Sequence, residues 1–345
     1  MAVSTIDPNG LNVGQLGGTR NLLINSGCQV AQRGTSFNPP ATGAYVVDRF
    51  HQYQGGGGVL YYEQSTDAPA GFSNSLKVTV NTADTSIASS DFYFMRQNIE
   101  GLNCTPLSLG TSDAVTFTLS FYVKSSLTGT FNGCFQNGAA DRSYVYEYTI
   151  NAANTWERKI VSLVGDATGT WFSDNRSGLR VTFDFGMGSS FNTTANSWQA
   201  GNYLSTSGTV KLVGTTGATW QITGVQLEVG DTATDFEHED YGTTLQKCQR
   251  YYEVVDLYEM VSTYIGSGKN QHYLTLFYKE TKRASPTIGS VSIGNYQPGG
   301  GSGTAQLEGN ALSTHCRVAT GSTNSSIPVQ IINSPSANMT IDAEL

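Results

Sequence analysis

Apolar and polar residues alternate along several short segments of the chain. Within residues 114–125, every second side chain from Val115 to Val123 is apolar, and the side chains between and after them are Thr, Ser, Tyr or Lys. A period of two is typical of a β-strand with one buried face and one solvated face. We therefore predict a central strand here, with its core face formed by Phe117, Leu119, Phe121 and Val123.

Similar segments recur from Asn21 to about Tyr241, rich in β-branched and aromatic residues. Clusters of Gly, Asn, Asp and Ser separate them and supply turn conformations. The segments are 76–80, 129–136, 143–150, 157–164, 179–186 and 219–228. Short strands at this spacing predict a β-sandwich or barrel over residues 21–241.

The pattern differs on both sides of this region. Residues 1–20 contain Pro-Asn-Gly and Gly-Gly and only isolated apolar residues, so they are either a disordered tail or an N-terminal assembly arm ordered by a partner subunit. Residues 242–256 predict a short helical connector, because Leu245, Cys248, Tyr252 and Val255 lie at helical spacing. Residues 257–345 predict a second, smaller β domain. The expected fold class is all-β.

Composition narrows the classes of partner. Only 13% of the 345 residues are charged, the net charge is −8, and Lys and Arg are scattered, which argues against nucleic-acid binding. No apolar run approaches the roughly eighteen residues of a membrane span, so no membrane insertion is expected. The N-terminal residues lack the pattern of a secretion signal, so we expect synthesis in the cytoplasm.

Five cysteines are far apart and form no CxxC pair. Their odd number prevents complete pairing within one chain, so we expect them to be reduced and mostly buried. They are Cys28, Cys104, Cys134, Cys248 and Cys316.

No motif of enzymatic chemistry stands out. The four histidines form no metal-binding pattern, and the GxSxG, P-loop and Rossmann patterns are missing. A glycosidase needs two facing carboxylates, and spacing along strands cannot establish such a pair. We predict no catalytic residue, no metal and no cofactor. The carboxylates considered are Asp141, Glu147, Asp166, Asp174, Asp184 and the Glu-His-Glu-Asp cluster at 237–240.

Aromatic residues make up 11% of the chain, and several lie in or beside expected loops. Sugar rings stack on aromatic faces, while Asn, Gln, Asp and Thr bind their hydroxyl groups. The alternative for each aromatic residue is packing in the core or in an interface. The aromatic residues in or beside expected loops include Tyr53, Tyr61, Tyr62 and Trp198. We select as candidate glycan contacts Trp171, Phe172, Tyr203, Tyr258 and Tyr264.

The order of motifs supports a resemblance to a known family. The opening NLLINSGCQVAQRG at 21–34 and the closing ITGVQLEVGDTATDFEHEDYGTTLQKCQRYYE at 222–253 carry most of it. With the segments between them, they resemble a module of phage and prophage tail-fibre and other virion proteins. The resemblance covers about two thirds of the chain.

Parts of this module also resemble carbohydrate-binding modules with a jelly-roll fold. They are NLLINSG, FTLSFYVKS and the closing TGVQLE. Such modules often hold a structural calcium ion with acidic residues at places that Gln29 and Thr223-Gly224 occupy here, which argues against calcium. The expected architecture is a jelly-roll β-sandwich followed by a short helix and a second, smaller β domain.

The resemblance implies a structural component of a bacteriophage virion. The leading hypothesis is a tail-fibre or receptor-binding subunit that attaches to host-surface polysaccharide. A capsid decoration or cement protein, or a tail adaptor without host contact, is the alternative, and a glycan-degrading tailspike is a minor one. We also expect a homotrimer whose residues 1–20 contact other tail or baseplate proteins.

Overall fold

The computed structural model describes residues 19–256, 263–264, 272–288, 296–297, 305–309, 315–320, 330–331 and 338–345. The chain divides into two compact units between Tyr241 and Gly242, with Leu345 grouped with the first. The expected arm lies outside the described residues except for Thr19 and Arg20. Within the described part, no helix is long and apolar enough to cross a membrane.

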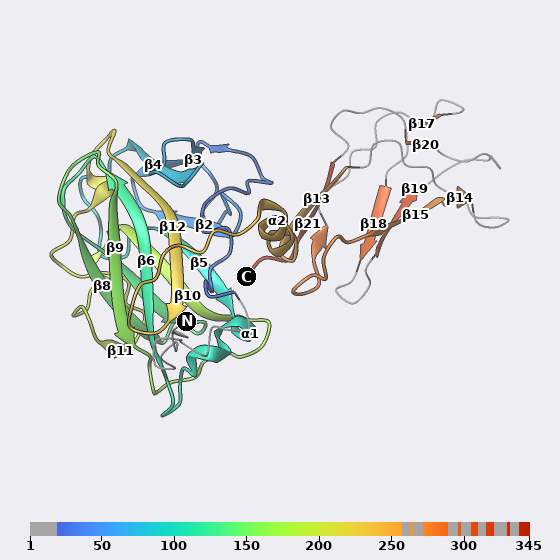
Figure 1. Ribbon diagram of the computed structural model, residues 1–345. Helices are drawn as coiled ribbons and strands as arrows, with labels where there is room; N and C mark the ends of the chain where they lie inside the picture. Colours follow the sequence, from blue (N-terminus) through green and yellow to red (C-terminus); the bar gives the residue numbers. More distant parts are fainter. Residues whose placement is uncertain are drawn as a thin grey trace, which may run out of the picture. The chain divides into compact units, whose positions relative to one another are not determined.

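The first unit is a sandwich of two six-stranded antiparallel sheets (Figure 1). Successive strands of the chain pass repeatedly from one sheet to the other, as in a jelly roll. The first sheet has the order β1 (Ser36–Phe37), β3 (Val59–Ser65), β4 (Ser75–Thr82), β12 (Thr219–Val229), β6 (Thr116–Ser125) and β9 (Glu157–Val164). The second has the order β11 (Trp198–Ala200), β8 (Arg142–Ile150), β7 (Gly129–Asn137), β10 (Ser177–Met187), β5 (Phe92–Glu100) and β2 (Phe50–Gly55).

The core lies between the two sheets, and strand β6 contributes to it as its alternation predicts. Phe117, Leu119, Phe121 and Val123 are fully buried. The opposite face of β6 is less solvated than predicted. Thr118 is also buried there. Its hydroxyl group tolerates burial because it bonds to the Ser162 hydroxyl and the Gly230 carbonyl.

Short helical turns connect several strands of the sandwich. They are α1 (Gly101–Cys104), η2 (Thr105–Leu107), η3 (Ser189–Phe191) and η4 (Leu212–Gly214). Cys28, Cys104 and Cys134 are buried free thiols of this unit, and burial raises the pKa of each to about 12. Thiols in this state are inert packing groups.

Helix α2 (Tyr241–Gln249) starts at the boundary between the two units and is shorter than the predicted connector. Tyr252 and Val255 lie instead on a strand, β13 (Tyr252–Asp256). Their β-branched and aromatic neighbours favour a strand, and β13 pairs with β21 (Asn338–Asp342), far along the chain. Cys248 of α2 is a buried free thiol.

The rest of the second unit is built from short antiparallel strands. Besides β13 and β21, the described strands are β14 (Thr263–Tyr264), β15 (His272–Phe277), β16 (Thr287–Ile288), β17 (Tyr296–Gln297), β18 (Ala305–Gly309), β19 (His315–Thr320) and β20 (Gln330–Ile331). Cys316 lies on β19. The predicted fold class, an all-β chain with a jelly-roll sandwich, one short helix and a second set of strands, is confirmed.

Candidate functional site

The outer face of the second sheet carries a cluster of large polar and aromatic side chains. On β10, Val181 points into the core, whereas Arg180 and Thr182 lie on the opposite face. On β5, Phe94 and Arg96 lie on the same outer face, and Arg96 is directly opposite Thr182 in the register of the two strands. Two arginines from distant segments thus meet on adjacent strands.

Arg96 is held by neutral partners. Its Nε donates to Thr182 Oγ1 at 2.8 Å, and its Nη2 donates to Gln136 Oε1 at 2.7 Å. Gln136 Nε2 donates in turn to Asn202 Oδ1 at 2.8 Å. The guanidinium carbon lies 4.7 Å from the centre of the Phe94 ring, a cation–π contact. These contacts fix the plane of the guanidinium group.

Arg180 is less completely bound. Its Nη2 donates to the carbonyl oxygen of Gly138 at 2.6 Å, while its Nε is buried and has no hydrogen-bond partner. Because a guanidinium group presents five N–H donors, Arg180 retains donors for a ligand. Tyr53, Arg96, Gln136, Arg180 and Thr182 are called the outer-face site below.

An aromatic row continues from this site along β2 and β5. The Tyr53 ring stacks on Phe94, with ring centres 4.9 Å apart and an interplanar angle of 23°. His51 contacts Tyr53 edge-on at 5.1 Å and stacks on Tyr45 at 4.7 Å. Tyr53 is only half-buried, unlike His51, which is buried.

The site is electrostatically positive. Burial and the neighbouring Arg180 charge lower the pKa of Arg96 to about 10. Burial also lowers the pKa of Arg180. The pKa of His51 is well below its ordinary value because of burial and the charges of Arg96, Arg49 and Arg180. His51 is therefore neutral at pH 7, and the two arginines supply the charge.

Of the three predicted glycan contacts in the first unit, Tyr203 lies beside this site. It follows Asn202, which bonds to Gln136, and its backbone N–H donates to Ser143 Oγ at 3.0 Å. Its ring packs on an apolar cluster that includes Phe94 and Leu204. Tyr203 therefore borders the outer-face site.

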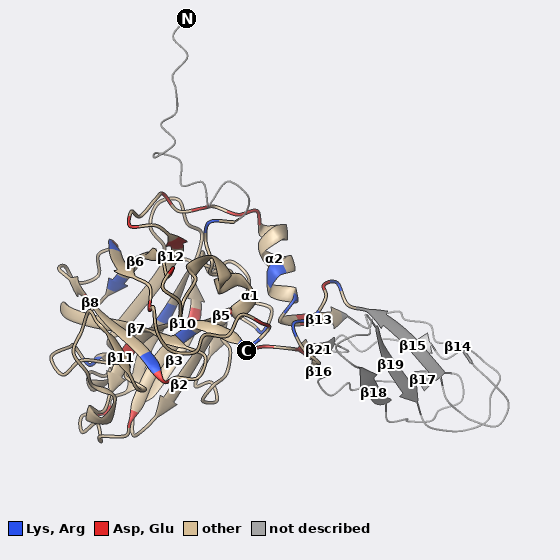
Figure 2. Cartoon of the chain, turned by 90° about the horizontal axis from the view of Figure 1, so that it is seen from below, with Lys and Arg blue, Asp and Glu red and all other residues tan. Residues whose placement is uncertain are grey.

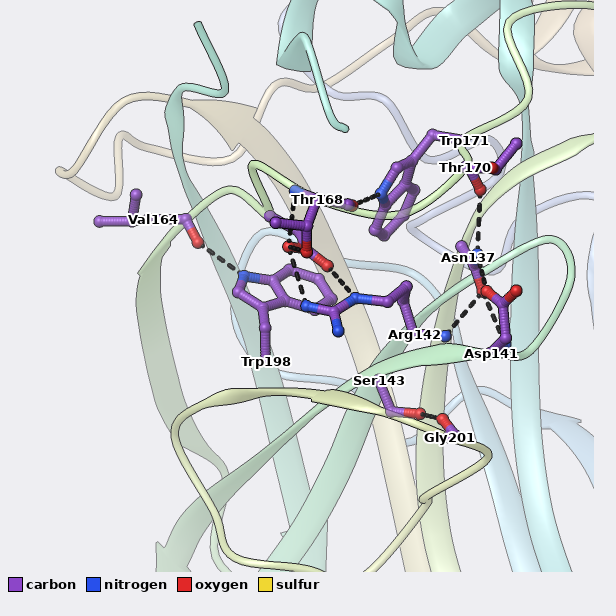
Figure 3. A network of polar contacts seen from close by, with 11 residues as sticks. Asn137, Asp141, Arg142, Ser143, Val164, Thr168, Thr170, Trp171, Trp198 and Gly201 are labelled. Atoms are coloured by element: carbon purple, nitrogen blue, oxygen red, sulfur yellow. Dashed lines mark hydrogen bonds and ion pairs between the residues drawn. The ribbon is translucent and has the colours of Figure 1, made fainter. Parts of the chain in front are cut away.

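Trp171 and Phe172 lie elsewhere, in the loop before β10. The Trp171 indole N–H donates to the Thr168 carbonyl at 2.9 Å, and its ring meets Trp198 edge-on at 5.5 Å (Figure 3). Trp198 donates to the Val164 carbonyl at 2.9 Å. Phe172 is covered by the Arg176 guanidinium group at 3.7 Å. Both candidates thus have local packing partners.

An ion pair holds this loop in place. Arg142 Nε and Nη2 donate to the two carboxylate oxygens of Asp166 at 2.6 and 3.0 Å (Figure 3). Asp166 Oδ1 also accepts from the backbone N–H and hydroxyl group of Thr168. This bidentate pair gives the Trp171 loop a structural role.

The other two predicted contacts belong to the second unit. Tyr258 lies outside the described residues, and Tyr264 is the last residue of β14. Sequence reasoning missed Arg96 and Arg180 altogether. The available signal was the alternation of side chains in RVTF (180–183) and FMRQ (94–97). In each segment it places the arginine on the face of the strand that points away from the core.

The carboxylates considered for hydrolysis have local partners. Asp184 is buried, accepts from Ser205 Oγ at 2.6 Å and lies 3.7 Å from Lys211 Nζ. Asp174 pairs with Arg176, and Glu147 accepts from Thr206 Oγ1 at 2.6 Å. The Asp141 carboxylate accepts from Asn137 Nδ2, and Glu237 Oε2 accepts from the Asn21 N–H at 2.9 Å.

The residues at the expected calcium position do not fit a cation. Gln64 Nε2 donates to the carbonyl oxygens of Cys28 and Gln29 at 2.7 and 3.0 Å, so an amide nitrogen occupies these oxygens. Thr223 is buried and brings no carboxylate. Over the described ranges, no group of three or more His, Cys, Asp or Glu residues could hold a metal.

Comparisons with known proteins were made by sequence and by structure. No protein-family model and no curated protein matches the chain. One similar solved structure is the enzymatically active domain of tailspike protein 4 of bacteriophage CBA120, at 14% identity and a TM-score of 0.35. The match covers 61% of this chain and 22% of that chain, so this chain corresponds to less than a quarter of that one.

Carbohydrate-binding modules are also similar. A family 11 module from Clostridium thermocellum, in complex with a β-1,3-1,4-mixed-linked tetrasaccharide, has 12% identity and a TM-score of 0.29 over 59% of this chain and 99% of that one. TmCBM61, in complex with β-1,4-galactotriose, has 9% identity and a TM-score of 0.31 over 61% of this chain and 100% of that one.

Proposed function

We propose that the chain binds glycans at the outer-face site. The observation that carries this proposal is the meeting of the half-buried Tyr53 ring with the fixed Arg96 and the incompletely bound Arg180. A tyrosine ring offers an apolar plane for a sugar ring, and guanidinium N–H groups donate to its oxygens. Such a combination of apolar surface and few oriented donors is typical of small-molecule and glycan sites.

Replacement of the Tyr53 ring tests the proposal. The variant Tyr53→Ala removes the stacking surface and should weaken glycan binding about tenfold. Binding is measured by screening the full chain against immobilised bacterial polysaccharides. Tyr61→Ala is the matched control, because Tyr61 is also a partly buried tyrosine and lies on β3 of the other sheet. Equal binding by wild type and Tyr53→Ala would contradict the assignment of this face.

We further propose that this binding serves host attachment by a bacteriophage particle. The support is the resemblance of segments 21–34 and 222–253 to tail-fibre modules. Antibodies against the chain, viewed on particles by electron microscopy, should label the tail. Labelling of the capsid alone would favour the decoration or cement role. The expected homotrimer is checked separately, by light scattering of the purified chain.

A binding role without catalysis is part of the proposal. The carboxylates Asp166, Asp174 and Asp184 are engaged with Arg142, Arg176 and Ser205, which supports a structural use for each. Incubation with a bound polysaccharide should release no oligosaccharides. Chain shortening that is lost in Asp184→Asn or Glu147→Gln would contradict this part and favour the tailspike role.

A further inference from the structure

We propose that the outer-face site selects anionic glycans, whose carboxylate, sulfate or phosphate groups bind between Arg96 and Arg180. The inference rests on the proposed glycan binding and names the class of glycan. It follows from the charges of the site, their partners and their burial.

The two arginines of the site lack the counter-charge that other arginines of the sandwich have. Arg142 pairs with Asp166, and Arg176 pairs with Asp174. By contrast, every hydrogen bond of Arg96 and Arg180 goes to a neutral group, and neither lies within ion-pair distance of a carboxylate in the described part of the chain. Among the described residues, neither arginine of the site therefore has an ion-pair partner.

These charges are also close together and withdrawn from water. Arg180 lies opposite Asn98 on β5, two residues from Arg96, so the two arginines are diagonal neighbours on paired strands. Only 8% of Arg96 is exposed. Like charges in such surroundings repel each other and lose hydration, which disfavours the empty site. A bound anion removes both penalties.

The donors suit an anionic group better than a hydroxyl group. A guanidinium fork matches the geometry of a carboxylate or a phosphate, and its hydrogen bonds to such groups are about twice as strong as neutral ones. Arg180 is partly exposed, and its Nη1 forms no hydrogen bond within the described part of the chain, so this end of the guanidinium group can donate to an anion. Tyr53 lies beside it and can support the sugar ring that carries the anion.

The net charge of the whole chain argues against nonspecific attraction of polyanions. With a net charge of −8, and with charged residues scattered over the sandwich (Figure 2), the chain repels polyanions at long range. Binding to a polyanion therefore requires a local positive site. Because part of the attraction is electrostatic, higher salt should weaken it.

The test uses the full chain and immobilised polymers of defined charge at about 0.1 M salt. Polygalacturonate carries carboxylates, dextran sulfate carries sulfates and a glycerol teichoic acid carries phosphodiesters; dextran and galactan are the neutral polymers. We expect at least one anionic polymer to bind about tenfold more tightly than either neutral one. The anionic polymer that binds identifies the preferred group.

Three variants locate the binding. Arg180→Gln should weaken anionic binding about tenfold or more, and Arg180→Lys, which keeps the charge but loses the fork, should be intermediate. Arg176→Gln is the matched control, because it removes an equal charge from an exposed arginine paired with Asp174. Arg180→Gln should also melt at an equal or higher temperature than wild type, which shows that lost binding is not lost folding.

Each outcome is decisive. Equal binding of neutral and anionic polymers overturns the charge selection while the proposed glycan binding stands. Binding of no polymer by wild type contradicts both proposals. Anionic binding that Arg180→Gln and Arg176→Gln weaken equally shows that the attraction lies outside the outer-face site, and it overturns the inference.

Discussion

Asn21 Oδ1 accepts a hydrogen bond from the backbone N–H of Leu227 at 3.0 Å, which joins the start of the sandwich to its closing strand. The same oxygen accepts from the Leu23 N–H at 3.1 Å, and Asn21 Nδ2 donates to the Val225 carbonyl at 2.9 Å. One amide thus binds two segments separated by about two hundred residues.

Replacement of this amide should destabilise the sandwich. Asn21→Ala leaves buried backbone groups of β12 without partners, so we expect a loss of about 2–4 kcal/mol in the free energy of unfolding. Urea denaturation followed by tryptophan fluorescence measures it. Asn81→Ala is the control, because the Asn81 side chain is exposed and bonds only to Thr82 among the described contacts. Equal stabilities for the two variants would show that the bond to Leu227 contributes nothing.

A second prediction concerns the core face of β6. Leu119 is fully buried between the sheets, so Leu119→Ala should lower the free energy of unfolding by about 2–5 kcal/mol through lost transfer energy and a new cavity. Thermal melting measures the change. Ile160→Ala on the neighbouring strand β9 is the control, because 55% of Ile160 is exposed. A melting temperature of Leu119→Ala within error of wild type would place β6 outside the core.

The sequence predicts the sandwich better than it predicts the connector. In β6 the period of two is unambiguous, because Phe117, Leu119 and Phe121 alternate with polar residues. In 242–256 the spacing of Tyr252 and Val255 fits a helix, but both residue types also favour strands. Residues 252–256 form a strand because β21, more than eighty residues later in the chain, pairs with them. Local pattern contains no information about that partner.

The outer-face site shows the same limit. Arg96 and Arg180 are 84 positions apart in the sequence, and each alone is an ordinary polar residue of an alternating strand. Only the antiparallel pairing of β5 with β10 makes them neighbours. Aromatic content, by contrast, is visible in the sequence, but it does not distinguish Tyr53, at the site, from Trp171, which packs on Trp198.

A third prediction is a pH-dependent loss of stability at the turn before β9. Burial alone would raise the pKa of Glu157, but hydrogen bonds from Lys159 Nζ, from the Ala152 N–H and from Asn151 outweigh it and lower the pKa to about 2. A carboxyl group with a lowered pKa in the folded state stabilises the fold above its ordinary pKa of 4.5. That stabilisation disappears as the pH falls from about 5 towards 2.

The variant Glu157→Gln separates this contribution from general acid denaturation. At pH 7 it should be less stable than wild type by about 1 kcal/mol, since solvent screens part of the interaction. The difference should shrink below pH 4.5 and vanish near pH 2 in melts of both proteins. A difference that stays constant from pH 7 to pH 3 would show that the Glu157 charge has no role.

The last prediction concerns the second unit, where Lys282 and Glu253 form a fully buried ion pair. Lys282 Nζ donates to Glu253 Oε2 at 2.6 Å, and neither side chain is exposed. The same ammonium group also donates to the Gln249 carbonyl at the end of α2, and Glu253 lies on β13. Removal of one partner leaves a buried unpaired charge, so Lys282→Met should destabilise this unit by about 3–5 kcal/mol. Hydrogen exchange at the β13 amides, followed by mass spectrometry of the full chain, should accelerate accordingly.

The double variant Glu253→Leu/Lys282→Met removes both charges and should regain most of the lost protection, because apolar pairs of similar volume replace buried ion pairs at little or no cost. Equal exchange rates in the single and double variants would mean that the ammonium group acts through its bond to Gln249 rather than through its charge pair with Glu253.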